Sequence, residues 1–182
     1  MARVTPGRDE DQGIGIGHNG GPPLPDDAKQ RIEDRIKLEK HEWRRVMETL
    51  TQTELNEHWQ AKVANISDSD VRERLAAIRL SPAQCNALKL LYGRLCDHMS
   101  ADPDNDPGEA WPTQKSLAKA LGWSERTVRT YLGLLAVLGY LWTHRTKRRP
   151  RQCVTRNHYR LRSPVVAYEE ATGNMFPVPT GK

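Results

Sequence analysis

The side chains with the clearest chemistry in this sequence are basic and small polar groups between positions 124 and 162. Ten Lys and Arg residues lie from position 126 to 162 with no Asp or Glu among them. They are Arg126, Arg129, Arg145, Lys147, Arg148, Arg149, Arg151, Arg156, Arg160 and Arg162. Guanidinium and ammonium groups pair with phosphate, and guanidinium also pairs with guanine through two hydrogen bonds. This segregation of charge predicts a polyanionic partner for the C-terminal half.

Other motifs in the sequence lack the neighbouring residues that their chemistry requires. The G-x-G-x-x-G at 15–20 is followed by Pro22 and Pro23 instead of a helix, so it predicts no nucleotide site. The Asp-rich run at 102–106 has Pro107 where a calcium loop needs glycine. No histidine pair has the H-E-x-x-H spacing of a zinc enzyme. We therefore expect no catalytic residue, no metal and no cofactor.

The three cysteines form no C-x-x-C pair. Cys85 and Cys96 are eleven residues apart, on the same side of one helix, and with His98 they lack a fourth metal ligand. They are predicted to be small buried side chains in a reducing compartment.

The polar side chains after Ser124 need an element that presents them together. Thr113 caps a first helix. In "LAKALGWSERTVRTYLGLL" (117–135), Gly122 ends this helix in a left-handed conformation and Ser124 caps a second helix. The inward positions of the second helix are predicted to be Val128, Leu132 and Leu135, with Tyr131 and Leu138 alongside. The outward positions are Glu125, Arg126, Thr127, Arg129, Thr130 and Gly133. This pattern is typical of a helix-turn-helix, whose second helix enters a major groove about 12 Å wide.

A basic hairpin is predicted to follow. "GYLWTHR" (139–145) and "CVTRNHYRLR" (153–162) have strand-like composition, and the arginine-rich "TKRRPRQ" (146–152) joins them. Two strands with a basic tip form a wing beside the second helix. Three aromatic residues near the strands are predicted to close the core: Trp111, Tyr140 and Trp142.

"AWPTQKSLAKALGWSERTVRTYLGLLAVLGYL" resembles the winged helix-turn-helix family that reads W-P-S/T-x-x-x-L-A, then G-x-S-x-R-T-V, then L-G-Y/L-L. The matching residues are Trp111, Pro112, Thr113, Leu117, Ala118, Gly122, Ser124, Arg126, Thr127, Val128, Leu138, Gly139 and Leu141, and 157–161 resembles the closing strand. Such domains occur in phage and plasmid replication proteins and in bacterial transcriptional regulators. The resemblance therefore implies binding to double-stranded DNA.

Each basic or polar residue has an expected role. The base-edge candidates are Arg126, Thr127 and Thr130. The phosphate candidates are Gln114, Lys115, Lys119 and Arg129. The wing candidates, for phosphates or the adjacent minor groove, are Arg145, Lys147, Arg148, Arg149 and Arg151.

The expected fold is mainly α with a small β wing. Residues 1–25 are predicted to be a disordered Gly/Pro-rich arm, 26–80 a helical region, 81–162 the winged helix-turn-helix domain and 163–182 a disordered tail. Within 26–80 we expect helices at about 26–50, 54–63 and 68–80, and a loop follows at 100–110. The apolar side of 26–50 either packs within its own chain or forms a homodimer seam.

Two function classes follow. The first is sequence-specific DNA binding in transcription regulation or replication initiation. The alternative is a protein-interaction module that docks a replication or regulatory partner. In both cases we expect no enzyme activity and no membrane span, in a cytoplasmic, nucleoid-associated protein of a bacterium or an infected cell.

Overall fold

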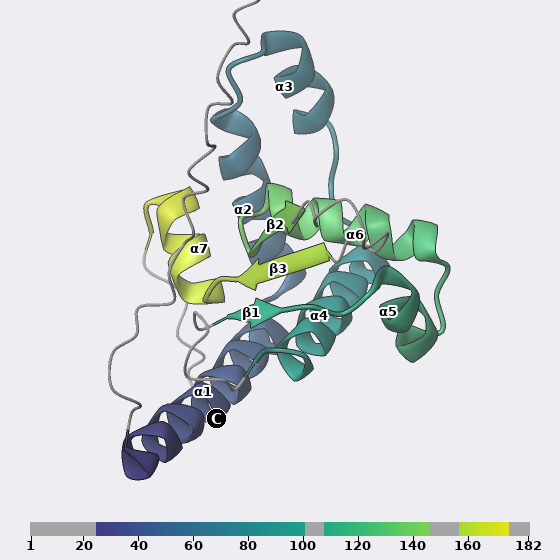
Figure 1. The fold of residues 1–182 in the computed structure, drawn as a ribbon. Helices are drawn as coiled ribbons and strands as arrows, with labels where there is room; N and C mark the ends of the chain where they lie inside the picture. The colour runs from purple at the N-terminus through teal and green to yellow at the C-terminus, as the bar shows by residue number, and fades with distance from the viewer. Residues whose placement is uncertain (1–24, 101–107, 146–156, 175–182) are drawn as a thin grey trace, which may run out of the picture.

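The computed structural model consists of helices and one small antiparallel sheet and describes residues 25–100, 108–145 and 157–174 (Figure 1). The helices are α1 (Asp26–Thr49), α2 (Gln52–Ala64), α3 (Ser69–Ala76), α4 (Pro82–Asp97), α5 (Gln114–Leu121), α6 (Glu125–Val137) and α7 (Pro164–Thr172). The strands are β1 (Glu109–Ala110), β2 (Leu141–Arg145) and β3 (Asn157–Leu161), in the order β1-β3-β2. The predicted mainly helical class with a small sheet is confirmed.

Local side-chain caps set where several helices begin. Thr51 accepts a hydrogen bond from the amide of Glu54, whose carboxylate accepts one from the amide of Thr51. Ser81 and Gln84 form the same reciprocal pair at the start of α4, with Pro82 in the first turn. Each pair satisfies two backbone donors that a helix start leaves without partners.

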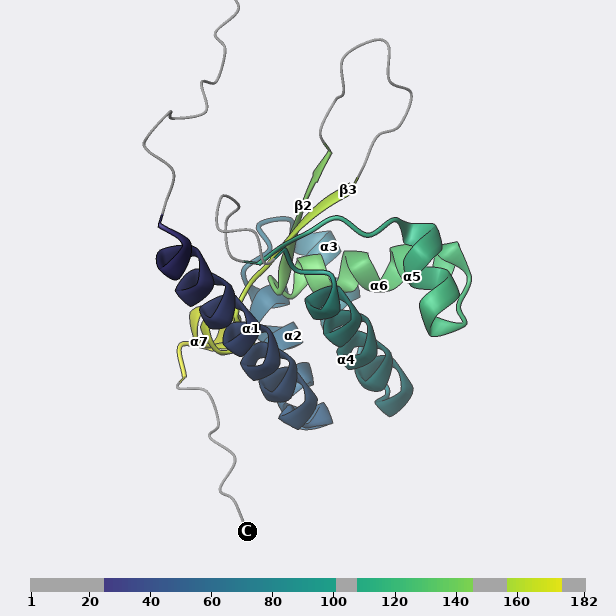
Figure 2. The same cartoon turned by 60° about the horizontal axis from the view of Figure 1, so that its bottom comes forward.

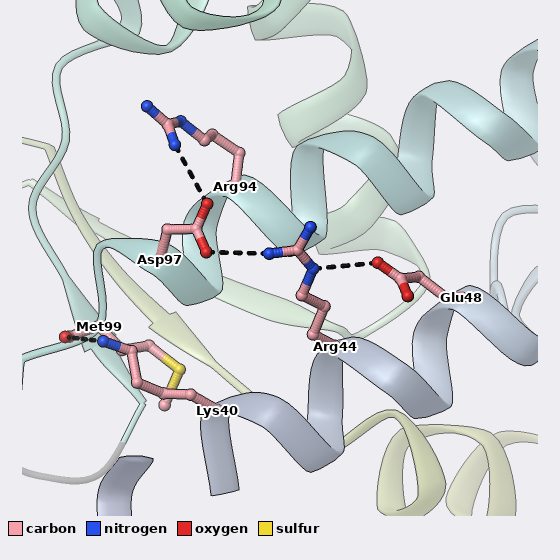
Figure 3. Close-up of polar contacts among 6 residues, drawn as sticks. All are labelled: Lys40, Arg44, Glu48, Arg94, Asp97 and Met99. Carbon is pink, nitrogen blue, oxygen red and sulfur yellow. Dashed lines mark hydrogen bonds and ion pairs between the residues drawn. The ribbon is translucent and has the colours of Figure 1, made fainter. Parts of the chain in front are cut away.

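α1 and α4 lie side by side and antiparallel, joined by the polar contacts drawn in Figure 3. Lys40 Nζ donates to the carbonyl of Met99 at 2.9 Å, and Arg44 Nη1 lies 3.2 Å from Asp97 Oδ1. Arg44 Nε also donates to Glu48 at 3.0 Å. These contacts hold α1 against the C-terminal end of α4, the helix that precedes β1 and the helix-turn-helix segment.

The apolar side of α1 is covered within the chain. Ile36, Met47 and Leu50 are buried, and α1 packs mainly on α4 and also contacts α7. Cys85 and Cys96 are buried on α4 as predicted.

One continuous core joins the helices before position 80 to the rest of the chain. His58 of α2 is fully buried, and its Nδ1 lies 2.6 Å from the hydroxyl of Tyr140 at the base of β2. The ring of Tyr168 on α7 is 5.7 Å from the His58 ring in an edge-on arrangement. Three segments far apart in the sequence therefore meet at one buried histidine.

α3 ends at Ala76, short of the predicted end at about 80. Val71 within the helix and Ile78 just after it are exposed, whereas Leu75 packs against the core. α3 is eight residues long, contacts mainly α2 and has no buried residue. A helix this short covers part of one neighbour, so only a narrow strip of its surface is removed from water.

The predicted loop at 100–110 contains a strand. Glu109 pairs with Arg160 and Ala110 with Tyr159 to form β1. Two residues are too few to show strand periodicity, so the partner strand specifies this one. Gly108 has φ 93°, and a Cβ there would lie 2.6 Å from the carbonyl oxygen of Leu161, so only glycine fits this approach. Residues 101–107 lie outside the described residues.

The predicted disordered tail is wrong for its first part. Residues Pro164–Thr172 form α7, in which Ala167 and Tyr168 are buried against the core. Pro164 sits in the first turn and Gly173 ends the helix with φ 69°. Burial of the tyrosine ring supplies the stabilisation that a short isolated helix lacks. The predicted N-terminal arm, through residue 24, lies outside the described residues.

Candidate nucleic-acid interface

The turn between α5 and α6 is built as its sequence predicts. Thr113 Oγ1 accepts from the amide of Ser116 at 3.0 Å and starts α5. Gly122 ends it with φ 68°, and Ser124 Oγ accepts from the amide of Thr127 at 3.1 Å to start α6. Between them, the amide of Trp123 donates to the carbonyl of Ala118. These bonds fix the angle between two helices with a connection of only three residues.

The inner side of α6 anchors the helix in the core. Val128, Leu132 and Leu135 are buried at the predicted spacing. At the turn, the rings of Trp123 and Tyr131 lie 5.4 Å apart. Because this side is held by packing, the opposite side of α6 has a fixed orientation.

That opposite side carries two of the three predicted base-edge residues in exposed positions. Arg126 and Thr130 are exposed, with Arg129 between them on the same side. Thr130 Oγ1 donates to the carbonyl of Arg126 at 3.1 Å, which leaves its oxygen able to accept. The third candidate, Thr127, is half-buried, and its hydroxyl lies 2.8 Å from Ser124 Oγ. Its hydroxyl therefore belongs to the helix cap.

The phosphate candidates on α5 lie along its outer side. Lys115 and Lys119 are exposed and four residues apart, so they share one side of the helix. Gln114 is half-buried at the first position of α5. Among the described residues, no acidic side chain lies within ion-pair distance of either lysine or of the α6 arginines.

The predicted wing is described only at its base. β2 follows α6 directly and pairs with β3 along its whole length, from Leu141 opposite Leu161 to Arg145 opposite Asn157. Figure 2 shows these two strands beside α6. Four wing candidates lie outside the described residues: Lys147, Arg148, Arg149 and Arg151. Their placement in a wing remains a prediction, as does that of the Arg145 side chain.

Two of the three aromatic predictions are wrong. Tyr140 is buried, but Trp111 and Trp142 are 36% and 48% exposed. Leu141 and Leu161 face the core, and alternation along the strands then turns Trp142 outward. The apolar residue adjacent to Trp142 was a sequence signal for this orientation, because neighbouring strand residues face opposite sides.

Titratable groups near the sheet are held by specific partners. Arg162 donates to Glu170 Oε1 at 2.6 Å, and this hydrogen bond lowers the pKa of the Glu170 carboxyl. Burial of His58, with a smaller effect from Lys62, lowers its pKa to about 4. His58 is therefore neutral at physiological pH and packs against Tyr140 and Tyr168 in the core.

Comparison with known proteins identifies the central segment. Residues 86–141 match the model of a family described as a helix-turn-helix domain. The match covers most of α4, all of α5 and α6, and the first residue of β2. No curated protein and no solved structure matches the chain.

The match and the geometry agree that 86–141 contains a helix-turn-helix domain, which suggests DNA binding. Within the described part of the chain, no helix is both long enough and apolar enough to cross a membrane. Over the same residues, no three His, Cys, Asp or Glu side chains are grouped as metal ligands.

Proposed function

We propose that this protein binds double-stranded DNA at specific sites through a winged helix-turn-helix and acts in transcription regulation or replication initiation. The observation that carries the proposal is the two-sided character of α6. Its Val128–Leu132–Leu135 side is buried, and its Arg126–Thr130 side is exposed at the N-terminal end of the helix. Side chains at that end reach base edges when such a helix lies in a major groove.

In this proposal Arg126 pairs with a guanine and the Thr130 hydroxyl oxygen accepts a hydrogen bond from a neighbouring base. Thr127 was a third base-edge candidate, and its engagement in the cap makes it the weakest of the three. Phosphates on the two flanks of the groove are contacted from α5 and α6 by Gln114, Lys115, Lys119 and Arg129.

In the proposal, the segment between β2 and β3 acts as the wing, and the adjacent groove is contacted by Arg145, Lys147, Arg148, Arg149 and Arg151. Contact with about six phosphates makes affinity fall with roughly the fifth power of salt concentration.

Selection from randomised duplexes, followed by titration at two salt concentrations, tests the proposal. Arg126→Ala is expected to lower discrimination at one base pair by about 1–3 kcal/mol. Arg148→Ala with Arg149→Ala is expected to weaken all duplexes equally and to reduce the salt exponent by about two. Arg45→Ala, which removes an exposed arginine from α1, is the matched control and is expected to change neither quantity.

The alternative is a domain that docks a replication or regulatory partner protein. It predicts no salt-sensitive affinity for any duplex. If the chain shows none while Arg45→Ala and the wild type behave alike, DNA binding is wrong.

A further inference from the structure

The outer side of the sheet carries an aromatic residue that the helix-turn-helix does not use. The register aligns Trp142 of β2, Arg160 of β3 and Glu109 of β1 in one cross-strand row. This row faces away from the core side, where Leu141 and Leu161 are buried. The indole of Trp142 is 48% exposed, so a large apolar surface contacts water here unless a ligand covers it.

Cations from separate segments gather beside this indole. Arg162 Cζ lies 5.1 Å from the centroid of the Trp142 ring and Arg160 Cζ 6.0 Å from it. Lys62 of α2 reaches the same corner: a Cβ built on Gly139 would lie 3.2 Å from Lys62 Nζ and 4.0 Å from Arg162 Nη1. We call Trp142, Arg160, Arg162 and Lys62 the Trp142 site.

Arg160 lies on β3 and Arg162 directly follows this strand, so both guanidinium groups lie on one flank of the indole. β2 is an edge strand of the sheet as described, with β3 on its only paired side. The flank of Trp142 toward the open edge is therefore the accessible one. A ligand with a flat surface can contact the indole ring from this flank and lie close to the guanidinium groups of Arg160 and Arg162.

The charge around the site favours an anionic ligand. Glu170 partly neutralises Arg162, with which it shares a hydrogen bond, and Glu109, the cross-strand neighbour of Arg160, lies 3.2 Å from His158. Against these two acids, the Trp142 site has three cations, Arg160, Arg162 and Lys62. A ligand with a flat apolar surface and regularly spaced negative charges fits this combination.

We propose that the Trp142 site binds single-stranded DNA. An unpaired base stacks on the indole, and the adjoining phosphates lie against Arg160, Arg162 and Lys62. Bases inside a duplex present only their edges, so they offer Trp142 no flat surface, whereas every unpaired base has one. Stacking of an unpaired base on Trp142 follows from this geometry alone, whereas the choice of DNA over RNA rests on the proposed function.

Fluorescence anisotropy with a labelled oligothymidylate of about ten nucleotides tests the site in the full chain. Trp142→Ala is expected to weaken binding between about 5-fold and 100-fold, because stacking on an aromatic residue contributes that much per base. Trp142→Phe keeps an aromatic ring and is expected to stay within about threefold of wild type. Leu90→Ala, which truncates an exposed apolar residue of α4, is the matched control and is expected to bind like wild type.

A duplex arm separates this inference from the proposed function. Trp142→Ala is expected to leave duplex affinity unchanged, and Arg126→Ala to weaken duplex binding while leaving oligothymidylate binding intact. Equal binding of oligouridylate would overturn the assignment to DNA.

The inference is wrong if Trp142→Ala binds oligothymidylate as tightly as wild type, if the Phe variant loses as much as the Ala variant, or if wild type has no affinity for it. In the last case the exposed indole serves contact with a protein. Thermal unfolding of both variants checks that a loss of binding does not reflect a loss of fold.

Discussion

Individual side chains connect distant parts of this chain through contacts that local sequence does not reveal. His58 is buried between Tyr140 and Tyr168, and burial raises the pKa of the Tyr140 hydroxyl well above its usual range. Both partners of the 2.6 Å hydrogen bond are therefore neutral in the folded protein. This hydrogen bond gives His58 Nδ1 and the Tyr140 hydroxyl a partner without placing a charge in the core.

This pair makes stability depend on pH. The pKa of His58 is about 4 in the folded chain and about 6.5 when unfolded, so between these values only the unfolded chain binds the proton. The contribution of His58 to the free energy of unfolding is fully present above pH 6.5. The free energy of unfolding is expected to fall by about 3 kcal/mol as the pH drops to 4.

Urea unfolding at a series of pH values measures this change. His58→Gln is expected to make the free energy of unfolding less dependent on pH between pH 6.5 and 4. His41→Gln, at an exposed position of α1, is expected to leave this pH dependence unchanged. An unchanged slope in His58→Gln would show that other groups cause it.

At the scale of the element, the helix-turn-helix is specified by side chains within a few residues of each boundary. Thr113, Gly122 and Ser124 each act on their own helix end, and the structure has all three in their predicted places. The exposed arginines of α6 then follow from the packing of its other side. A local signal is sufficient here because capping bonds join residues only three positions apart.

Two glycines of this element are expected to respond oppositely to alanine. Gly122 has φ 68°, so Gly122→Ala is expected to lower the free energy of unfolding by about 1 kcal/mol. Gly133 lies inside α6, where Gly133→Ala is expected to raise it by about 0.5–1 kcal/mol. Neither new Cβ meets an atom within 4 Å, so each change reports backbone conformation alone in thermal unfolding. A destabilised Gly133→Ala would contradict this assignment.

At the scale of the whole molecule, the helix-turn-helix segment shares its core with the rest of the chain. The buried cluster that contains Leu132 of α6 also contains Met47 of α1, Leu50 just after α1, Trp59 of α2 and Tyr168 of α7. A fragment restricted to 81–162 would expose the surfaces that these residues cover.

We therefore expect the full chain to unfold in one cooperative transition, with far-ultraviolet circular dichroism and tryptophan fluorescence changing together. The 81–162 fragment is expected to have a lower unfolding midpoint in urea, because apolar area buried in the full chain is exposed to water. Two separate transitions in the full chain would instead indicate independent domains.

The sequence by itself determined the elements whose signals are local. The caps and the left-handed glycine indicated α4, α5, the turn and α6, and the spacing of apolar residues indicated which side of α6 is exposed. The start of α7 carried the same Ser-Pro signal as the start of α4, at Ser163–Pro164, so this helix was missed although its local signal was present.

Only the tertiary structure decided the contacts between distant segments. β1 exists because β3 pairs with it, His58 is buried because Tyr140 and Tyr168 enclose it, and Trp142 faces water because Leu141 takes the inner position. A shift of one residue in strand register reverses which side chains face the core. That choice depends on partners far away in the chain, whereas a helix cap depends on neighbours three residues away.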